Sequence, residues 1–312
     1  MQRGLRDYLV LSIKGGFMGV ADTVPGVSGG TVAFVTGIYE ELIASLARIG
    51  PARLGDLKQG GPLAAWQAIN GNFLLAVFAG LIVALFSVAQ LMSWLLDQHR
   101  ILLWAFFFGL ILASVPLVLT RMRYWRFGHI GWAGSGIAVG LGITLLGPGS
   151  TPDALWMIFL AGMIAISAMV LPGISGSFLL LLMAKYETMV TAVVERDVLV
   201  VAVFMVGAVI GILSVSRIVA ALFRRHHDAT IALLTGFMFG SLNALWPWRH
   251  GIAEGGLDAH YWPWNFEAAS GQPPQVLAVL VCFLAGVGLV VLFARLEKSS
   301  GPENSLGTSG HD

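Results

Sequence analysis

The chain has 312 residues, of which 57% are hydrophobic and 11% charged. Soluble globular proteins contain about 45–50% apolar and about 25% charged residues, so this composition excludes a soluble protein and predicts one that lies largely in lipid. The net charge of +1 excludes a nucleic-acid-binding surface, and the single cysteine, Cys282, excludes disulfides and thiolate metal sites; no metal or other cofactor is predicted.

Apolar segments of two kinds follow one another along the chain. A membrane-spanning helix needs roughly 20 mostly apolar residues. Two regions, about 8–47 and 154–190, are apolar but interrupted by Pro and Gly. Six uninterrupted segments are long enough to span: 73–96, 101–120, 130–147, 198–222, 229–247 and 276–294. The N-terminal stretch lacks a clean cleavage site and is not predicted to be a signal peptide, whereas the tail at 299–312 is predicted to be disordered.

The distribution of basic residues indicates the orientation. We assume that each interrupted region enters the membrane and returns to its own side. With a cytoplasmic N-terminus, 13 Lys and Arg residues then fall inside, 4 fall outside, and Arg217 lies within a span. The positive-inside rule favours this arrangement, which places both termini in the cytoplasm.

The sequence contains an internal repeat. The segment PGVSGG at 25–30 recurs as PGISGS at 172–177, an offset of 147. A second offset, 127, relates Gly80, His99 and Gly109 to Gly207, His226 and Gly236. Three predicted spans, an odd number, separate the two motifs, so the halves are expected to be inverted. The predicted domains are 1–147 and 148–298, followed by the tail 299–312.

The predicted fold is therefore an all-α integral membrane protein with two inverted-topology repeats. Each repeat is expected to hold one broken, re-entrant helical hairpin and three transmembrane helices. Inverted repeats are a transporter architecture, with the substrate site at the repeat interface near the membrane midplane.

The two repeated motifs are expected to break helices. Pro removes a backbone donor and the adjacent Gly permits a sharp turn, so the predicted breaks fall at Pro25-Gly26 and Pro172-Gly173. Each new half-helix begins with unpaired N–H groups, which favour a phosphate or carboxylate. The predicted binding residues are Ser28, Gly29, Gly30, Thr31, Ser175, Gly176 and Ser177. The alternative is that both motifs are hinges whose small residues permit close helix packing.

Charged residues in the apolar segments are the remaining candidates. Asp22 precedes the first break, and Met169 stands at its repeat position, so Asp22 is interpreted either as a protonatable coupling group or as a helix cap. Arg217 either binds phosphate or extends to the interface. The matched Glu40 and Glu187 are interpreted as gating groups or as residues that hold each hairpin against a neighbouring helix.

Two enzyme signatures were compared with the chain. Ser216-Arg217 resembles the start of the membrane phosphatidate phosphatase motif, but its histidine would fall at position 223, which is Phe223. His226, His227 and Asp228 come too late, and the paired-Asp motif of phosphoalcohol transferases is absent. The sequence predicts a binding protein rather than an enzyme. A small-anion channel or carrier remains an alternative, with a lipid phosphatase or phosphotransferase as the enzyme alternative.

Three segments resemble the bacterial family of polyprenyl-phosphate transporters: ADTVPGVSGGT at 21–31, TGIYE at 36–40 and LPGISGS at 171–177. The resemblance covers about residues 5–297. It implies a flippase of the cytoplasmic membrane that returns undecaprenyl phosphate, the carrier lipid of peptidoglycan, to the cytoplasmic leaflet. The implied partners are this lipid and the surrounding membrane lipids, with homo-oligomerisation left open. We expect the two halves to rock against each other, with protonation of Asp22 biasing the cycle.

Overall fold

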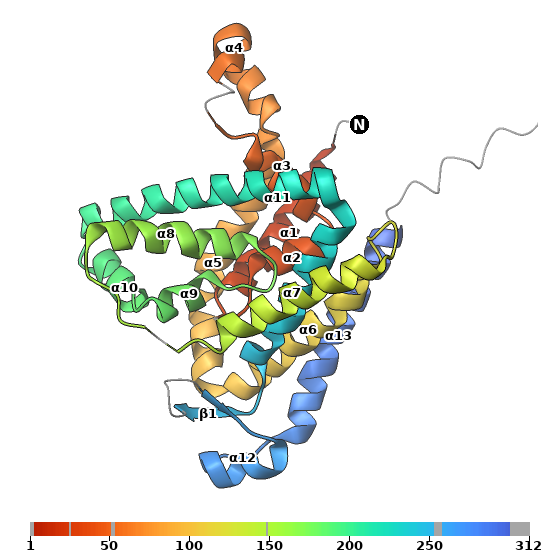
Figure 1. Ribbon diagram of the computed structural model, residues 1–312, viewed down its shortest axis with the longest axis vertical. Coiled ribbons are helices and arrows are strands. Elements are labelled where there is room, and N and C mark those ends of the chain that lie inside the picture. The colour runs from red at the N-terminus through yellow and green to blue at the C-terminus, as the bar shows by residue number, and fades with distance from the viewer. Residues whose placement is uncertain (1–2, 25, 51–53, 148, 253–257, 300–312) are drawn as a thin grey trace, which may run out of the picture.

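The computed structural model describes residues 3–24, 26–50, 54–147, 149–252 and 258–299. Of this part 79% is helical, which confirms the predicted all-α membrane fold (Figure 1). Pro25 and nearly all of the tail predicted to be disordered lie outside the described residues.

The elements of the first half are α1 (Leu5–Asp22), α2 (Gly29–Val35), α3 (Tyr39–Ala47), α4 (Leu54–Ala68), α5 (Gly71–Gln98), α6 (Arg100–Leu119) and α7 (Phe127–Thr144). Those of the second half are α8 (Leu155–Val170), α9 (Gly176–Leu182), α10 (Tyr186–Val194), α11 (Val198–Ser241), η2 (Leu242–Leu245), β1 (Arg249–Ile252), β2 (Asp258–His260), α12 (Pro263–Ser270) and α13 (Val276–Ser299).

Most predicted spans correspond to helices. Among the described residues, four stretches are long and apolar enough to cross a membrane: α5, α6, α11 together with η2, and α13. The predicted spans 198–222 and 229–247 both lie in this third stretch, whose backbone is broken at His226 with φ −141° and ψ 55°. The predicted span 130–147 corresponds to α7, which is helical but is not among the four.

Both repeated motifs break their helices where the sequence predicts. In the first, α1 ends at Asp22, Ser28 is the N-cap of α2, and Gly26 has φ +92°. In the second, Ser175 is the N-cap of α9 and Gly173 has φ +86°. Each short helix is followed by a second one at a sharp bend, 119° between α2 and α3 and 105° between α9 and α10.

Close glycine contacts recur at positions related by the two sequence offsets. Gly15 on α1 lies directly against the carbonyl of Val77 on α5. Gly162 on α8 lies in the same way against the carbonyl of Phe204 on α11. Gly162 follows Gly15 by the offset of 147, and Phe204 follows Val77 by the offset of 127. The packing of α1 on α5 is thus built from the same repeat positions as the packing of α8 on α11.

The last helix of each half packs against the other half. Gly109 on α6 lies against the carbonyl of Phe283 on α13, and Gly236 on α11 lies against that of Ala133 on α7. Gly109 and Gly236 are related by the offset of 127. The two halves are therefore interlocked through α7 and α13.

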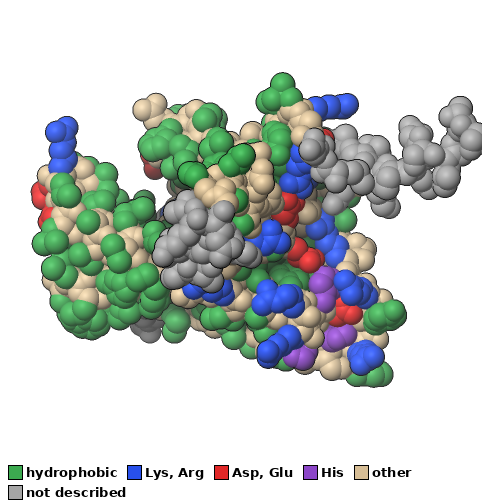
Figure 2. Space-filling view, turned by 90° about the horizontal axis from the view of Figure 1, so that it is seen from above, with side chains coloured by type: hydrophobic (Ala, Val, Ile, Leu, Met, Phe, Trp, Pro, Cys, Tyr) green, Lys and Arg blue, Asp and Glu red, His purple; other side chains and the backbone are tan. Residues whose placement is uncertain are grey.

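The surface is apolar over the long helices. Phe86 on α5 and Leu277 on α13 are each 77% exposed, and in the end view of Figure 2 hydrophobic side chains gather over the left part of the molecule. Such a surface is unfavourable in water and suits a hydrocarbon environment. The helix α4, which the sequence did not predict, projects away from the other helices at the top of Figure 1.

Candidate functional site at the two helix breaks

The two helix breaks, far apart in sequence, are in direct contact. The Ser28 hydroxyl donates a hydrogen bond to the carbonyl of Met169 at 2.8 Å, and the backbone N–H of Gly173 donates to the Thr31 hydroxyl at 2.8 Å. Ser28 and Thr31 are buried. Position 30 must be small, because a Cβ there would lie 2.6 Å from the carbonyl oxygen of Val170. The breaks therefore form one site at the interface between the halves.

The N-terminus of α2 already holds a carboxylate. The N–H of Gly29 donates to Asp22 Oδ1 at 2.7 Å, and the N–H of Gly30 donates to the Ser28 hydroxyl at 3.1 Å. A carboxylate at this place is favoured by the partial positive charge of the helix N-terminus and by the charge-assisted hydrogen bond. Asp22 thus lies where the sequence predicted a bound anion.

The N-terminus of α9 lacks such a carboxylate. Ser175 accepts a long hydrogen bond from the N–H of Phe178 at 3.5 Å, and its hydroxyl lies 3.0 Å from that of Ser177. The N–H groups of Gly176 and Ser177 have no acceptor among the described residues. Because position 169 is Met, this helix start offers two N–H groups and two hydroxyls without a neighbouring negative charge.

The C-terminal ends of both short helices lie near lysines that the sequence analysis did not assign to the site. Lys14 Nζ donates to the carbonyl of Thr36 at 2.6 Å, just past the end of α2, where a cation is favoured by the helix dipole. Lys185, which is 1% exposed, follows α9 and donates to Asp153 at 2.6 Å. A lysine within an interrupted apolar segment is the sequence signal that could have identified both residues.

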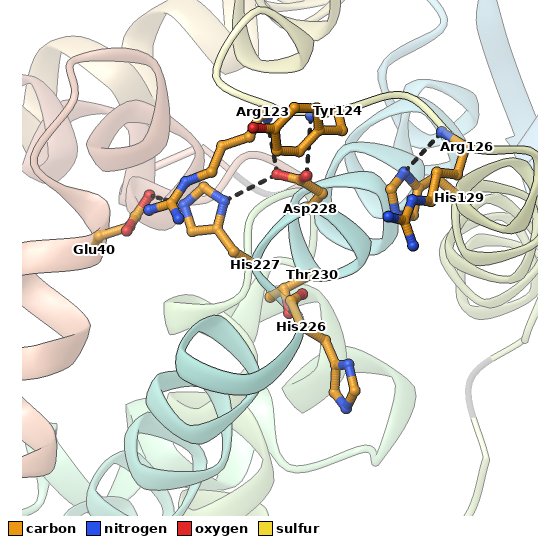
Figure 3. Close-up of polar contacts among 9 residues, drawn as sticks. All are labelled: Glu40, Arg123, Tyr124, Arg126, His129, His226, His227, Asp228 and Thr230. Atoms are coloured by element: carbon orange, nitrogen blue, oxygen red, sulfur yellow. Dashed lines mark hydrogen bonds and ion pairs between the residues drawn. The ribbon is translucent and has the colours of Figure 1, made fainter.

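Glu40 belongs to a separate hydrogen-bonded network at the bend of α11 (Figure 3). His227 lies 3.1 Å from Glu40 Oε1 through Nε2 and 3.1 Å from Asp228 Oδ1 through Nδ1. Asp228 also accepts hydrogen bonds from the backbone N–H groups of Arg123 and Tyr124 at 2.9 and 3.1 Å. This network joins α3, α11 and the connection between α6 and α7.

The other predicted site residues lie away from the breaks. Arg217 donates to the carbonyl of Ile49 at 2.6 Å, on the connection after α3. Glu187 stands in the first turn of α10, is exposed, and forms no ion pair with another described residue. The structure thus places Asp22 at the first Ser-Gly segment and places that segment against the residues just before the second one. Arg217, Glu40 and Glu187 lie outside this cluster.

An apolar pocket lies beside the first break. It has a volume of about 130 Å³ and lies between α1, α2, α6 and α13. Phe17, Val32, Phe107 and Phe293 are among its lining residues. A pocket without polar lining suits a hydrocarbon group and gives no hydrogen bonds to a polar one.

Comparison with known proteins agrees with these features. Residues 18–257 match a family described as undecaprenyl phosphate translocase-like. A polyprenyl-phosphate transporter of Vibrio cholerae is 42% identical over 294 residues, covering 91% of this chain and 96% of the relative. A polyprenyl-phosphate transporter of Staphylococcus aureus is 36% identical over 255 residues, covering 75% of this chain and 85% of the relative. No solved structure matches the chain.

Proposed function

Because the chain belongs to the undecaprenyl phosphate translocase-like family, we propose that it carries undecaprenyl phosphate from the outer to the cytoplasmic leaflet of the bacterial cytoplasmic membrane. Both termini lie in the cytoplasm in this proposal, and the two halves are inverted. The observation that carries the proposal is the contact between two broken helices whose first turns present hydroxyl and N–H groups.

The chemical difficulty is to move a charged headgroup past hydrocarbon. An isolated ion transferred to a medium of low dielectric constant costs tens of kcal/mol in idealised estimates. Fixed N–H and hydroxyl donors lower this cost because they replace the water that the headgroup gives up. Donors at a helix start also carry a partial positive charge, which favours a phosphate.

The N-termini of α9 and α2 have different roles in this mechanism. The headgroup binds first at α9, where the N–H groups of Gly176 and Ser177 and the hydroxyls of Ser175 and Ser177 lack a competing carboxylate. At α2 the ionised Asp22 repels a second anion, so protonation of Asp22 lets the headgroup reach the N–H of Gly29.

The hydrocarbon chain follows a different path from the headgroup. The apolar pocket of about 130 Å³ touches α2 and is large enough for only a short part of a polyprenyl chain. The rest of the chain stays among the membrane lipids, along the exposed apolar faces of α5 and α13. Rocking of one repeat against the other then exposes the headgroup to either leaflet.

The test uses purified protein in vesicles with a fluorescent short-chain polyprenyl phosphate. Transfer between leaflets is measured with a quencher that cannot cross the membrane, and polyprenol of the same length is the control. We expect transfer of the phosphate, and we expect a Ser28→Ala/Ser175→Ala double variant to be slower than either single variant. Release of inorganic phosphate would instead indicate a phosphatase, and passage of inorganic phosphate alone would indicate an anion carrier.

A further inference from the structure

A basic pocket lies at the break in α11 and shares no residue with the two repeated motifs. This α11-bend pocket has a volume of about 610 Å³. Three segments that are far apart in sequence line it: α3 with the residue after it, the connection between α6 and α7, and α11 on both sides of His226. Figure 2 looks onto this end of the molecule, where Lys, Arg and His side chains gather in the right part of the view.

Four arginines line the α11-bend pocket. They are Arg48 at the end of α3, Arg123 from the connection between α6 and α7, and Arg224 and Arg225 just before the break in α11. All four residues are exposed. None of their guanidinium groups forms a hydrogen bond or an ion pair with another described residue. Their N–H groups are therefore available to a ligand.

The acids near the α11-bend pocket are engaged with other groups. Glu40, the one acid among the described lining residues, lies 3.1 Å from His227 Nε2 (Figure 3). Asp228 lies on the other side of this histidine and accepts two backbone N–H groups. Glu41 attracts one of the lining arginines but forms its ion pair with Arg3, at 2.6 Å. The lining thus carries more positive than negative charge.

The joint that forms this pocket occurs twice in the chain. His226 breaks α11 with φ −141° and ψ 55°. His99, related to it by the offset of 127, lies between α5 and α6 with φ −135° and ψ 36°. The two joints share one backbone conformation, so this conformation does not by itself dictate the side chains around it.

The arginines of the α11-bend pocket are not part of the repeat. Glu195 stands at the repeat position of Arg48, by the offset of 147. By the offset of 127, the repeat positions of Arg224 and Arg225 carry Asp97 and Gln98. The same joint therefore forms without arginine at these three positions, and the arginines need a cause other than the fold.

The α11-bend pocket also has an apolar wall. Ile43 and Ala44 on α3 and Phe223 on α11 contribute to it. A pocket with guanidinium groups on one side and apolar side chains on the other suits an anion that is attached to a hydrocarbon chain.

We propose that the α11-bend pocket binds a phosphate monoester carried by a hydrocarbon chain. Arg binds phosphate oxygens in pairs, and the apolar wall takes the first part of the chain. The choice of lipid rests on the proposed function: the pocket holds the headgroup of the polyprenyl phosphate at one end of its passage through the helix breaks. The same guanidinium groups suit free inorganic phosphate, so the test separates these two sources.

The test measures how far a ligand protects a reporter cysteine in the pocket from a maleimide, with the protein in detergent micelles. In a Cys282→Ser background, Ala44→Cys is the reporter, and Ala47→Cys is a second one in the same lining. The probes are short-chain polyprenyl phosphate, the matching polyprenol, inorganic phosphate and phosphatidylglycerol. At about ten times its dissociation constant, a ligand that covers the reporter slows labelling about tenfold.

Charge variants test which groups hold the ligand. Arg224→Gln/Arg225→Gln is expected to raise the half-protecting concentration of polyprenyl phosphate about tenfold or more, because two charged donors are lost. Arg126→Gln is the matched control, since Arg126 is exposed on the same connection as Arg123 but does not line the pocket. Glu40→Gln is expected to lower the half-protecting concentration by removing the acid from the lining, a gain that misfolding cannot produce.

The outcomes separate this pocket from the proposed function. Protection by polyprenyl phosphate but not by polyprenol supports the site, and equal protection by inorganic phosphate assigns it to free phosphate. Equal protection by phosphatidylglycerol overturns the proposal, because the arginines then attract any anionic lipid, as the positive-inside rule alone would require. Equal protection by polyprenol, no protection of either reporter, or unchanged protection in the double arginine variant overturns it as well. Protection without lipid transfer in vesicles supports the pocket and removes the proposed function.

Discussion

Ser28 and Ser175 occupy the same repeat position but have different surroundings, and the difference predicts different effects of their removal. The buried Ser28 hydroxyl donates to Met169 and accepts from the N–H of Gly30. The Ser175 hydroxyl makes only a 3.5 Å contact with the N–H of Phe178 and a contact with Ser177. Ser28→Ala is therefore expected to reduce stability, and Ser175→Ala to reduce lipid binding.

The magnitudes follow from the groups left without partners. Ser28→Ala leaves the part-buried carbonyl of Met169 and the buried N–H of Gly30 without this partner, and each such group costs about 1–3 kcal/mol, so the expected loss is about 2–6 kcal/mol. Ser175→Ala removes a weak helix cap, for which the expected loss is about 0.5–1 kcal/mol. The same change removes one of the two hydroxyls beside the unpaired N–H groups of α9.

The assay combines thermal unfolding in detergent micelles with native mass spectrometry of the protein carrying polyprenyl phosphate. We expect Ser28→Ala to lower the unfolding temperature more than Ser175→Ala, and Ser175→Ala to lower lipid retention more than Ser28→Ala. Equal losses of stability, or a greater loss of lipid from the Ser28 variant, would refute the assignment of a structural role to one serine and a binding role to the other.

Three further variants test other contacts. Asp22→Asn keeps an acceptor for the N–H of Gly29, so lipid retention should persist while any pH dependence of transfer in vesicles disappears; unchanged pH dependence would make Asp22 a helix cap only. Gly173→Ala places a Cβ 2.7 Å from Met238 at φ +86° and should lower the free energy of unfolding by about 2–4 kcal/mol. Gly271→Ala, at φ +68° with open space around it, should lower it by about 1–2 kcal/mol. Equal losses in the two variants would contradict a steric clash between position 173 and Met238. Glu40→Gln should lower stability by less than about 1 kcal/mol, and only at low salt, with Glu187→Gln as the unpaired control that shows no change.

The helix breaks were predictable because their causes are local. Pro and Gly act on the backbone of their own turn, so the residue pattern alone places the ends of α1 and α8 and the caps Ser28 and Ser175. The repeat was predictable for a related reason, since equivalent packing positions such as Gly80 and Gly207 require the same small residue in both halves.

Contacts that cross between elements were not predictable in this way. The sequence shows that Asp22 lacks an acidic counterpart, but only the fold shows that its carboxylate meets the N–H of Gly29. His227 was considered only for a phosphatase motif, because nothing local links it to Glu40, 187 residues away. Arg217 is a similar case, since its acceptor on Ile49 lies 168 residues earlier.

The exchange of α7 and α13 between the halves has a consequence for the order in which the chain assembles. The first half is synthesised and inserted before α13 exists, yet α6 packs Gly109 against a carbonyl of α13. Until the last helix enters the membrane, that face of α6 has only lipid beside it, and lipid cannot fill the space around a glycine as closely as a helix backbone does. The first half is thus incomplete until the final helix is inserted, and a chain that ends before α13 exposes this face of α6 while α7 still packs against α11.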